Sequence, residues 1–206
     1  MTALDFYFDV SCRWAWWASI WLRRIVPQRS LEVTWKVFSL AVQDNPDNYR
    51  EPPARPHHIQ DVDLHRSLVA ARRAGGQAAL DRLYLAYGNV IHADRGDVRD
   101  PAIQRQCLSA AGLPLTLFDD AQRDPATEAE LVADTRAALA LGVLGTPTLA
   151  LAGSDATLLG PVLGAVPAES EALELWTAVE FALRHPYVYE LKRNRDKGTP
   201  ENLRAD

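Results

Sequence analysis

Cysteine and histidine, the residue types that most often bind metals or take part in redox chemistry, are scarce in this chain. Its 206 residues include only two cysteines, Cys12 and Cys107, and five histidines. No Cys/His spacing matches a zinc site, so we expect no metal. No glycine-rich loop precedes a helical pattern, so we expect no tightly bound nucleotide either. The cysteine thiol is left as the reactive group of interest.

Long apolar runs and basic clusters are also lacking. The segment from Met1 to Asp5 has neither the basic nor the apolar region of a signal peptide, and no apolar run reaches membrane-spanning length. The net charge of −5 comes with no basic patch large enough for nucleic acid. We therefore expect a cytoplasmic protein that binds neither membranes nor nucleic acid. Stable disulfides are rare in that compartment.

The most informative segment lies near the N-terminus. Apolar residues alternate with more polar ones from Leu4 to Phe8, which is typical of a strand. From Trp14 an apolar stripe with helical spacing follows, and Pro27 is its expected end. Cys12 thus lies at the start of the helix, where free N–H groups and the helix dipole favour a thiolate. We expect a nucleophile with a lowered pKa; the alternative is a small buried cysteine.

The second cysteine falls in a helical pattern over residues 101–111, which begins near Asp100 and ends at Gly112. Cys107 lies on the apolar face of this pattern. We therefore expect a structural cysteine of the core, with a remote resolving thiol as the alternative.

The rest of the chain has room for one substantial core and reads as strand, a long helical stretch, two strands and a closing helix. The second strand is expected over residues 31–38, and residues 44–56 are rich in proline, which disfavours regular helix. The remaining elements are expected as helices over 61–74, 77–87, 101–111, 126–141 and 170–184, and as a hairpin over 147–152 and 156–159.

Three segments together resemble a known family. The motif Phe-Asp-x-x-Cys-x-Trp-x-Trp around Cys12 resembles the active-site entry of DsbA-type thioredoxin-fold proteins. Gly145-Thr146-Pro147-Thr148 is similar to the cis-proline loop of that fold. Residues 83–92, with 160–163 and 186–193, are most similar to the cytoplasmic mycothiol-dependent nitroreductases. The resemblance implies an α/β, thioredoxin-like domain of residues 1–42 and 143–206, interrupted by an all-helical insertion of residues 43–142.

The resemblance also implies roles for individual residues. The catalytic set would be Cys12, Arg13 and Trp14. The cis-proline loop would bind a low-molecular-weight thiol, mycothiol, as co-substrate, through Gly145, Thr146 and Pro147. Four residues would bind an electrophilic or disulfide substrate: Trp16, Tyr87, Asn89 and His92. For Arg13 the alternative is a solvated side chain, for Trp16 a subunit contact, and for His92 an ordinary hydrogen-bonding histidine.

The motif departs from the family's usual Cys-x-x-Cys. Ala15 stands at the position of the second cysteine and Arg13 at that of the customary proline, so no local disulfide can form. We therefore predict a monothiol oxidoreductase in which Cys12 forms a mixed disulfide and a free thiol resolves it. Two alternatives stay open: a thiol S-transferase or isomerase resembling the kappa class of glutathione transferases, and a catalytically decayed paralogue that binds small molecules. Six tryptophans and an apolar tail further predict a homodimer.

Overall fold

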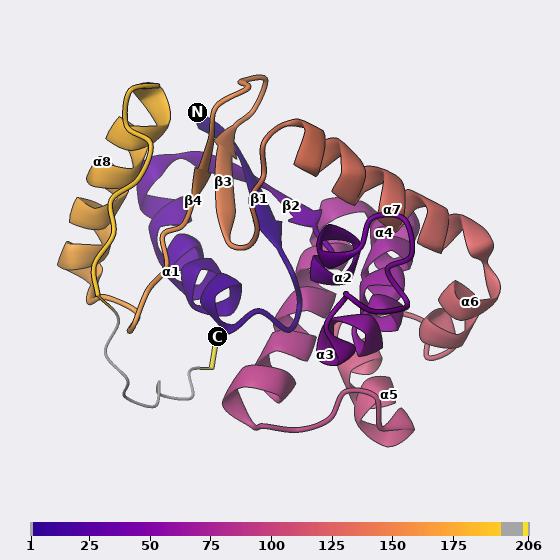
Figure 1. The fold of residues 1–206 in the computed structure, drawn as a ribbon. Coiled ribbons are helices and arrows are strands. Elements are labelled where there is room, and N and C mark those ends of the chain that lie inside the picture. Colours follow the sequence, from indigo (N-terminus) through magenta and orange to yellow (C-terminus); the bar gives the residue numbers. More distant parts are fainter. Residues whose placement is uncertain (1, 195–203, 206) are drawn as a thin grey trace.

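The computed structural model describes residues 2–194 and 204–205 and contains a four-stranded sheet in the order β2-β1-β3-β4 (Figure 1). Its strands are β1 (Thr2–Phe8), β2 (Leu31–Val37), β3 (Thr148–Leu151) and β4 (Thr157–Leu159). β1 is parallel to β2 and antiparallel to β3, and β3 is antiparallel to β4. The first strand is therefore interior, and Leu4, Phe6 and Phe8 on it are completely buried.

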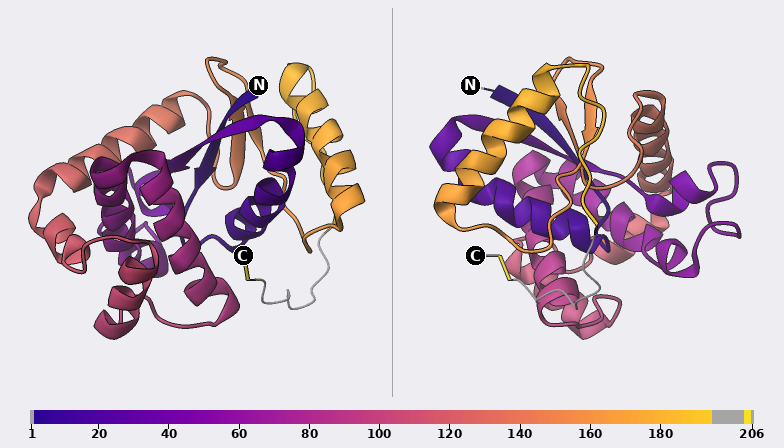
Figure 2. Two further views of the ribbon diagram at one scale, coloured as in Figure 1. Left: turned by 180° about the vertical axis from the view of Figure 1, so that it is seen from behind. Right: turned by 60° about the vertical axis from the view of Figure 1, so that its left-hand side comes forward.

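The helices form two groups, seen on opposite sides of the sheet in Figure 1 and again from behind in Figure 2. The first group is α1 (Arg13–Arg29) and α8 (Glu169–Arg184), which are held together by the Trp21 indole donating to the Ala172 carbonyl at 3.0 Å. The second group follows β2 in the chain and precedes β3: α2 (Leu40–Asp44), α3 (Pro56–Gln60), α4 (Val62–Gly88), η1 (Asn89–Ala93), α5 (Pro101–Ala110), α6 (Leu117–Arg123) and α7 (Pro125–Ala140).

Some element boundaries differ from those expected. Helix α1 continues through Pro27 to Arg29, because a proline this close to the end removes only one hydrogen bond of the last turns. The two helices expected around Gly75-Gly76 are a single α4 with non-helical dihedral angles at these glycines. The short helices α3 and α6 and the π-helical turn η1 were not expected, because so few residues give no periodic signal.

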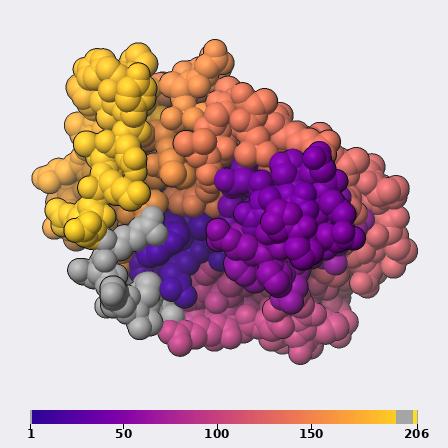
Figure 3. Space-filling view, in the orientation of Figure 1, coloured from indigo at the N-terminus to yellow at the C-terminus, as the bar shows by residue number. Residues whose placement is uncertain are grey.

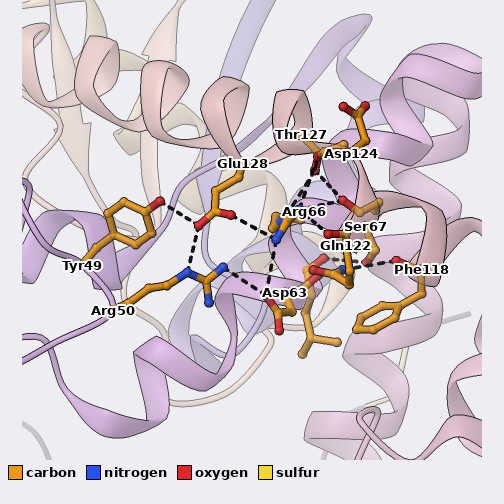
Figure 4. A network of polar contacts seen from close by, with 12 residues as sticks. Tyr49, Arg50, Asp63, Arg66, Ser67, Phe118, Gln122, Asp124, Thr127 and Glu128 are labelled. Carbon is orange, nitrogen blue, oxygen red and sulfur yellow. Dashed lines mark hydrogen bonds and ion pairs between the residues drawn. The ribbon is translucent and has the colours of Figure 1, made fainter.

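The proline-rich segment between α2 and α3 is tied to the helices by a network of charged and polar side chains (Figure 4). Glu128 of α7 accepts hydrogen bonds from the Tyr49 hydroxyl at 2.7 Å and from Arg50 Nε at 2.8 Å. The buried guanidinium of Arg66 on α4 lies 3.0 Å from the other carboxylate oxygen of Glu128. The same Arg50 reaches Asp63 at 3.2 Å. This segment is thus fixed without regular secondary structure.

Cys107 is a core residue, as expected. Asp100 is the N-cap of helix α5: its carboxylate accepts a hydrogen bond from the Ala102 amide at 2.7 Å. Gly112 follows the end of the helix with a φ of +67°. The Cys107 side chain is 4% exposed, and burial raises the pKa of its thiol to about 11. A thiol with this pKa is almost entirely protonated at neutral pH.

The aromatic residues divide into buried and exposed sets. Five of the six tryptophans are at most 6% exposed in the single chain, so they need no partner subunit to cover them. Tyr187, Tyr189 and Leu191, which follow α8, are 66 to 89% exposed. Homodimer formation remains a prediction that rests on this tail.

None of the helices in residues 2–194 and 204–205 has both the length and the apolar character that a membrane span requires.

Candidate active site

Cys12 caps the N-terminus of α1, as its place in the sequence predicted. Its backbone is extended, with φ −73° and ψ 107°, and its carbonyl accepts the first hydrogen bond of the helix from the Trp16 amide at 2.9 Å. The amides of Trp14 and Ala15 hydrogen-bond to the Cys12 sulfur, an interaction that favours its thiolate form. These are two of the free N–H groups that every helix start presents.

The loop before β3 meets Cys12 although 134 residues separate the two in sequence. The Cys12 thiol donates a hydrogen bond to the Thr146 carbonyl at 3.4 Å, and the peptide bond between Thr146 and Pro147 is cis. Gly145 has a φ of +147°, which favours glycine, and its carbonyl accepts from the Thr148 hydroxyl at 2.7 Å. The predicted thiol-binding residues therefore lie against the predicted nucleophile.

The pKa of Cys12 differs from the expectation. Burial of the side chain raises the pKa of the thiol above its ordinary value, and the negative charge of Asp9 adds to the rise. Hydrogen bonding with Thr146 and with the two helix amides acts in the opposite direction without cancelling it. The prediction of a lowered pKa is therefore wrong, because it considered the helix start alone. Arg13, expected to help as a cation, is exposed to solvent.

A buried acid–base pair supports the loop that carries Cys12. Asp9 accepts hydrogen bonds from the Ser11 amide at 2.9 Å, the Ser11 hydroxyl at 2.8 Å and the Leu40 amide at 2.9 Å. His65 Nε2 of α4 lies 3.3 Å from the Asp9 carboxylate, and both side chains are completely buried. Burial opposes both charges, but their attraction prevails: it raises the pKa of His65 and, with the hydrogen bonds, lowers that of Asp9.

The sequence patterns did not identify this pair. Asp9 belongs to the motif that carried the resemblance, and His65 has an ordinary helical context. Their contact joins residues 56 positions apart in the chain, and nothing local predicts it.

His92 contacts the same loop through its imidazole ring. Its Nε2 lies 2.9 Å from the Val10 carbonyl, and its ring stacks on Trp16 with the ring centres 5.7 Å apart. Burial lowers the pKa of His92 to about 4, so the ring is neutral at pH 7 and Nε2 donates to the carbonyl. His92 belongs to the π-helical turn η1, a feature often found at functional sites.

Two of the four predicted substrate residues lie in the core instead. Trp16 is 0% exposed, because α1 packs both on the sheet and on the end of α4, where a Cβ on Gly88 would lie 2.1 Å from the Trp16 ring. Tyr87 is also 0% exposed and shares a hydrogen bond of 3.1 Å with the Ser67 hydroxyl. Neither ring offers a face to a substrate in this structure, which corrects the expectation.

Of the other predicted site residues, Trp14 lies in the first turn of α1 and Asn89 on η1. Trp14 is partly buried and meets Trp17 edge to face, with ring centres 5.9 Å apart. Asn89, the first residue of η1, is hydrogen-bonded to Ala205 near the C-terminus. In Figure 3 the indigo N-terminal part of the chain reaches the surface between the orange strands that follow Pro147 and the violet segment of α2 and α3.

Comparison with known proteins identifies the family. Residues 11–193 match the model of the family described as Rv2466c-like, mycothiol-dependent nitroreductase Rv2466c. The chain belongs to this family. The match confirms the resemblance and the prediction of an oxidoreductase enzyme. A curated protein of Mycobacterium tuberculosis, the uncharacterized protein Rv2286c, is 35% identical over 204 residues, which cover 98% of this chain and 86% of that protein.

Solved structures confirm the thioredoxin-like α/β fold with a helical insertion. A 2-hydroxychromene-2-carboxylate isomerase is similar with a TM-score of 0.62 and 16% identity, over 88% of this chain and 96% of that one. The probable DsbA oxidoreductase SCO1869 from Streptomyces coelicolor has a TM-score of 0.60 and 20% identity over 88% and 91%. The cytosolic disulfide reductase DsbM from Pseudomonas aeruginosa has a TM-score of 0.58 and 16% sequence identity, and the match covers 87% of this chain and 99% of that one. At these identities the likeness concerns the fold.

Proposed function

We propose that the protein is a monothiol oxidoreductase that exchanges disulfides through Cys12 with a low-molecular-weight thiol. The observation that carries the proposal is the position of the Cys12 sulfur, between the free amides of the α1 N-terminus and the Thr146 carbonyl. One turn along the helix, where a dithiol enzyme has its second cysteine, Ala15 is completely buried. The other cysteine, Cys107, is buried against the Ala86 carbonyl at 3.8 Å.

The proposed reaction has two exchange steps. The Cys12 thiolate attacks one sulfur of a disulfide, the S–S bond breaks, and the second sulfur leaves as a thiolate that takes up a proton. A free thiol then attacks the mixed disulfide in its thiolate form, so that Cys12 is regenerated and a new low-molecular-weight disulfide is released. In the sum of the two steps one free thiol is consumed and one thiol is released, the number of disulfide bonds stays the same, and Cys12 is unchanged at the end.

The residues around Cys12 supply binding and support in this proposal. The backbone of Gly145, Thr146 and Pro147 binds the cysteinyl part of the thiol beside the sulfur, and Arg13 and Trp14 border the nucleophile. His92 and Asn89 on η1 contribute to the substrate side, while Trp16 and Tyr87 support that side from the core. The thiol we propose is mycothiol, because the family is named for it. DsbM has been solved with GSH, a thiol of the same general class.

A second candidate function is a thiol S-transferase or isomerase of the kappa-class type. The observation that favours it is the raised pKa of Cys12, since a neutral side chain there would suit a site that activates the thiol of its ligand.

Two expectations from the sequence remain predictions. One is the division of the chain into a thioredoxin-like domain (1–42 and 143–206) and a helical insertion (43–142). The other is a cytoplasmic location.

The proposal is tested by intact mass spectrometry after incubation with oxidised mycothiol, oxidised glutathione or coenzyme A disulfide. We expect one adduct per chain with the mass of one thiol moiety, and the mycothiol adduct should form fastest. A Cys12→Ser variant should carry no adduct, whereas the matched Cys107→Ser variant should react like wild type. An adduct that persists in Cys12→Ser, or no adduct with any disulfide, would contradict the proposal.

A further inference from the structure

Two residues at the ends of η1 hold a segment from the far end of the chain. The Asn89 carboxamide donates to the Ala205 carbonyl at 3.0 Å and accepts from the Ala205 amide at 2.8 Å. The Asp94 carboxylate, which follows the last residue of η1, pairs with the Arg204 guanidinium. The whole π-helical turn thus lies between two contacts to residues 204–205.

The Asn89 contact has the form of peptide recognition. One amide side chain satisfies both backbone groups of a single residue, as a neighbouring strand would do, and any residue of an extended peptide presents these groups. Other contacts determine which side chains the site accepts. Ala205 is only 7% exposed and belongs to the apolar cluster that contains Trp16, so the position takes a small side chain. Asp94 selects a cation at the preceding residue.

The ion pair between Arg204 and Asp94 sets the position of the bound segment and contributes little to the stability of the contact. Both side chains of the Arg204–Asp94 pair are about half exposed, and exposed pairs contribute little. A contact this weak is favoured by the covalent connection, since two parts of one chain meet at an effective concentration on the order of 1 mM. The site therefore suits a ligand that is part of the same chain.

The turn that holds this segment also supports the site around Cys12. His92 on η1 contacts the Val10 carbonyl at 2.9 Å, two residues before Cys12, and Trp16 abuts Gly88 immediately before η1. Figure 1 shows the short yellow segment of residues 204–205 beside α1, the helix whose N-cap is Cys12. His92 and both contacts to residues 204–205 thus lie on the same short turn or at its ends.

We propose that Asn89 and Asp94 form a binding site for an extended peptide with arginine followed by a small residue, and that the chain's own Arg204–Ala205 occupies it as an intramolecular ligand. Its occupation holds η1, and with it His92, against the loop of Cys12. The site does not depend on the proposed chemistry of Cys12, so either can fail alone.

The intramolecular contact is tested by swapping the charges of Asp94 and Arg204 in the full chain. The readout is the hydrogen–deuterium exchange of the η1 amides. Asp94→Arg and Arg204→Asp should each speed exchange at residues 89–93, and the double variant should return it toward the wild-type rate. Asn89→Ala, which removes two hydrogen bonds, should speed it about tenfold. Asp97→Arg, which changes an exposed carboxylate in the same loop, is the matched control and should leave η1 unchanged. Wild-type exchange in both single variants, or a double variant as fast as the faster single, would overturn the proposal.

Binding of a free peptide tests the site itself. The probe is an acetylated heptapeptide with the sequence of residues 200–206, and binding is followed by tryptophan fluorescence. We expect saturable binding to the Arg204→Asp protein and at least tenfold weaker binding to wild type, whose own segment competes. The same peptide with its arginine replaced by glutamate should not bind. Equal binding to both proteins, or none to the variant at concentrations up to about 10 mM, would overturn the proposal.

Discussion

Replacing His92 by glutamine should change how the stability of the protein depends on pH. In the folded protein the pKa of His92 is about 4, against 6.5 for the free side chain. The folded state therefore binds fewer protons than the unfolded chain between these values, and stability falls as the pH falls from about 6.5 toward 4. The gap of about 2.5 pKa units, at 1.36 kcal/mol each, corresponds to about 3 kcal/mol.

Glutamine cannot take up this proton, and its amide can donate to the Val10 carbonyl at any pH. We expect urea unfolding, followed by circular dichroism at pH 7.5, 6, 5 and 4, to show wild type losing about 3 kcal/mol relative to His92→Gln across this range. Other groups titrate in both proteins and largely cancel in the difference. His57→Gln, at an exposed histidine, is the control. A difference between wild type and His92→Gln that is independent of pH, or that grows in favour of wild type in acid, would refute the reasoning.

Three further predictions concern packing and assembly. Ala15→Cys should form a disulfide with Cys12 that wild type cannot make, so that oxidation leaves one free thiol, that of Cys107. Three free thiols after oxidation, counted with a thiol reagent in denaturant, would contradict the placement of Cys12. Gly88→Ala should destabilise by about 1–3 kcal/mol in urea, because the new methyl group meets the Trp16 ring, whereas Gly164→Ala, with nothing within 4 Å, should not. The protein should be a homodimer, so light scattering should give twice the 22.8 kDa of one chain. A mass of 22.8 kDa at all concentrations would mean that the exposed aromatic tail belongs to a monomer and forms no subunit interface.

The parts of the fold that could be predicted from sequence are those with local causes. The alternation from Leu4 to Phe8 and the helical stripe after Trp14 place Cys12 correctly at the start of α1. Asp100 and Gly112 mark the helix of Cys107 in the same way. The role of the loop around Pro147 came from the family resemblance, because one proline before a strand is not informative by itself.

What could not be predicted depends on contacts between distant segments. Trp16 lies off the apolar stripe of α1, yet it is buried because the end of α4 covers that side of the helix. The pKa of Cys12 rises because the surroundings bury the thiol and bring Asp9 near it, and neither effect is visible in the helix start. The pairing of Asn89 with Ala205 spans 116 residues. Such contacts depend on the tertiary structure.

The most direct test of the proposed monothiol mechanism follows the release of thiol from a preformed adduct. The mixed disulfide of Cys12 with mycothiol is isolated, reduced mycothiol is added, and intact mass is recorded over time in wild type and in Cys107→Ser. We predict that the adduct persists without free thiol, that reduced mycothiol releases it, and that both proteins release it at the same rate. Release without added thiol, with a disulfide between Cys12 and Cys107, would contradict the mechanism.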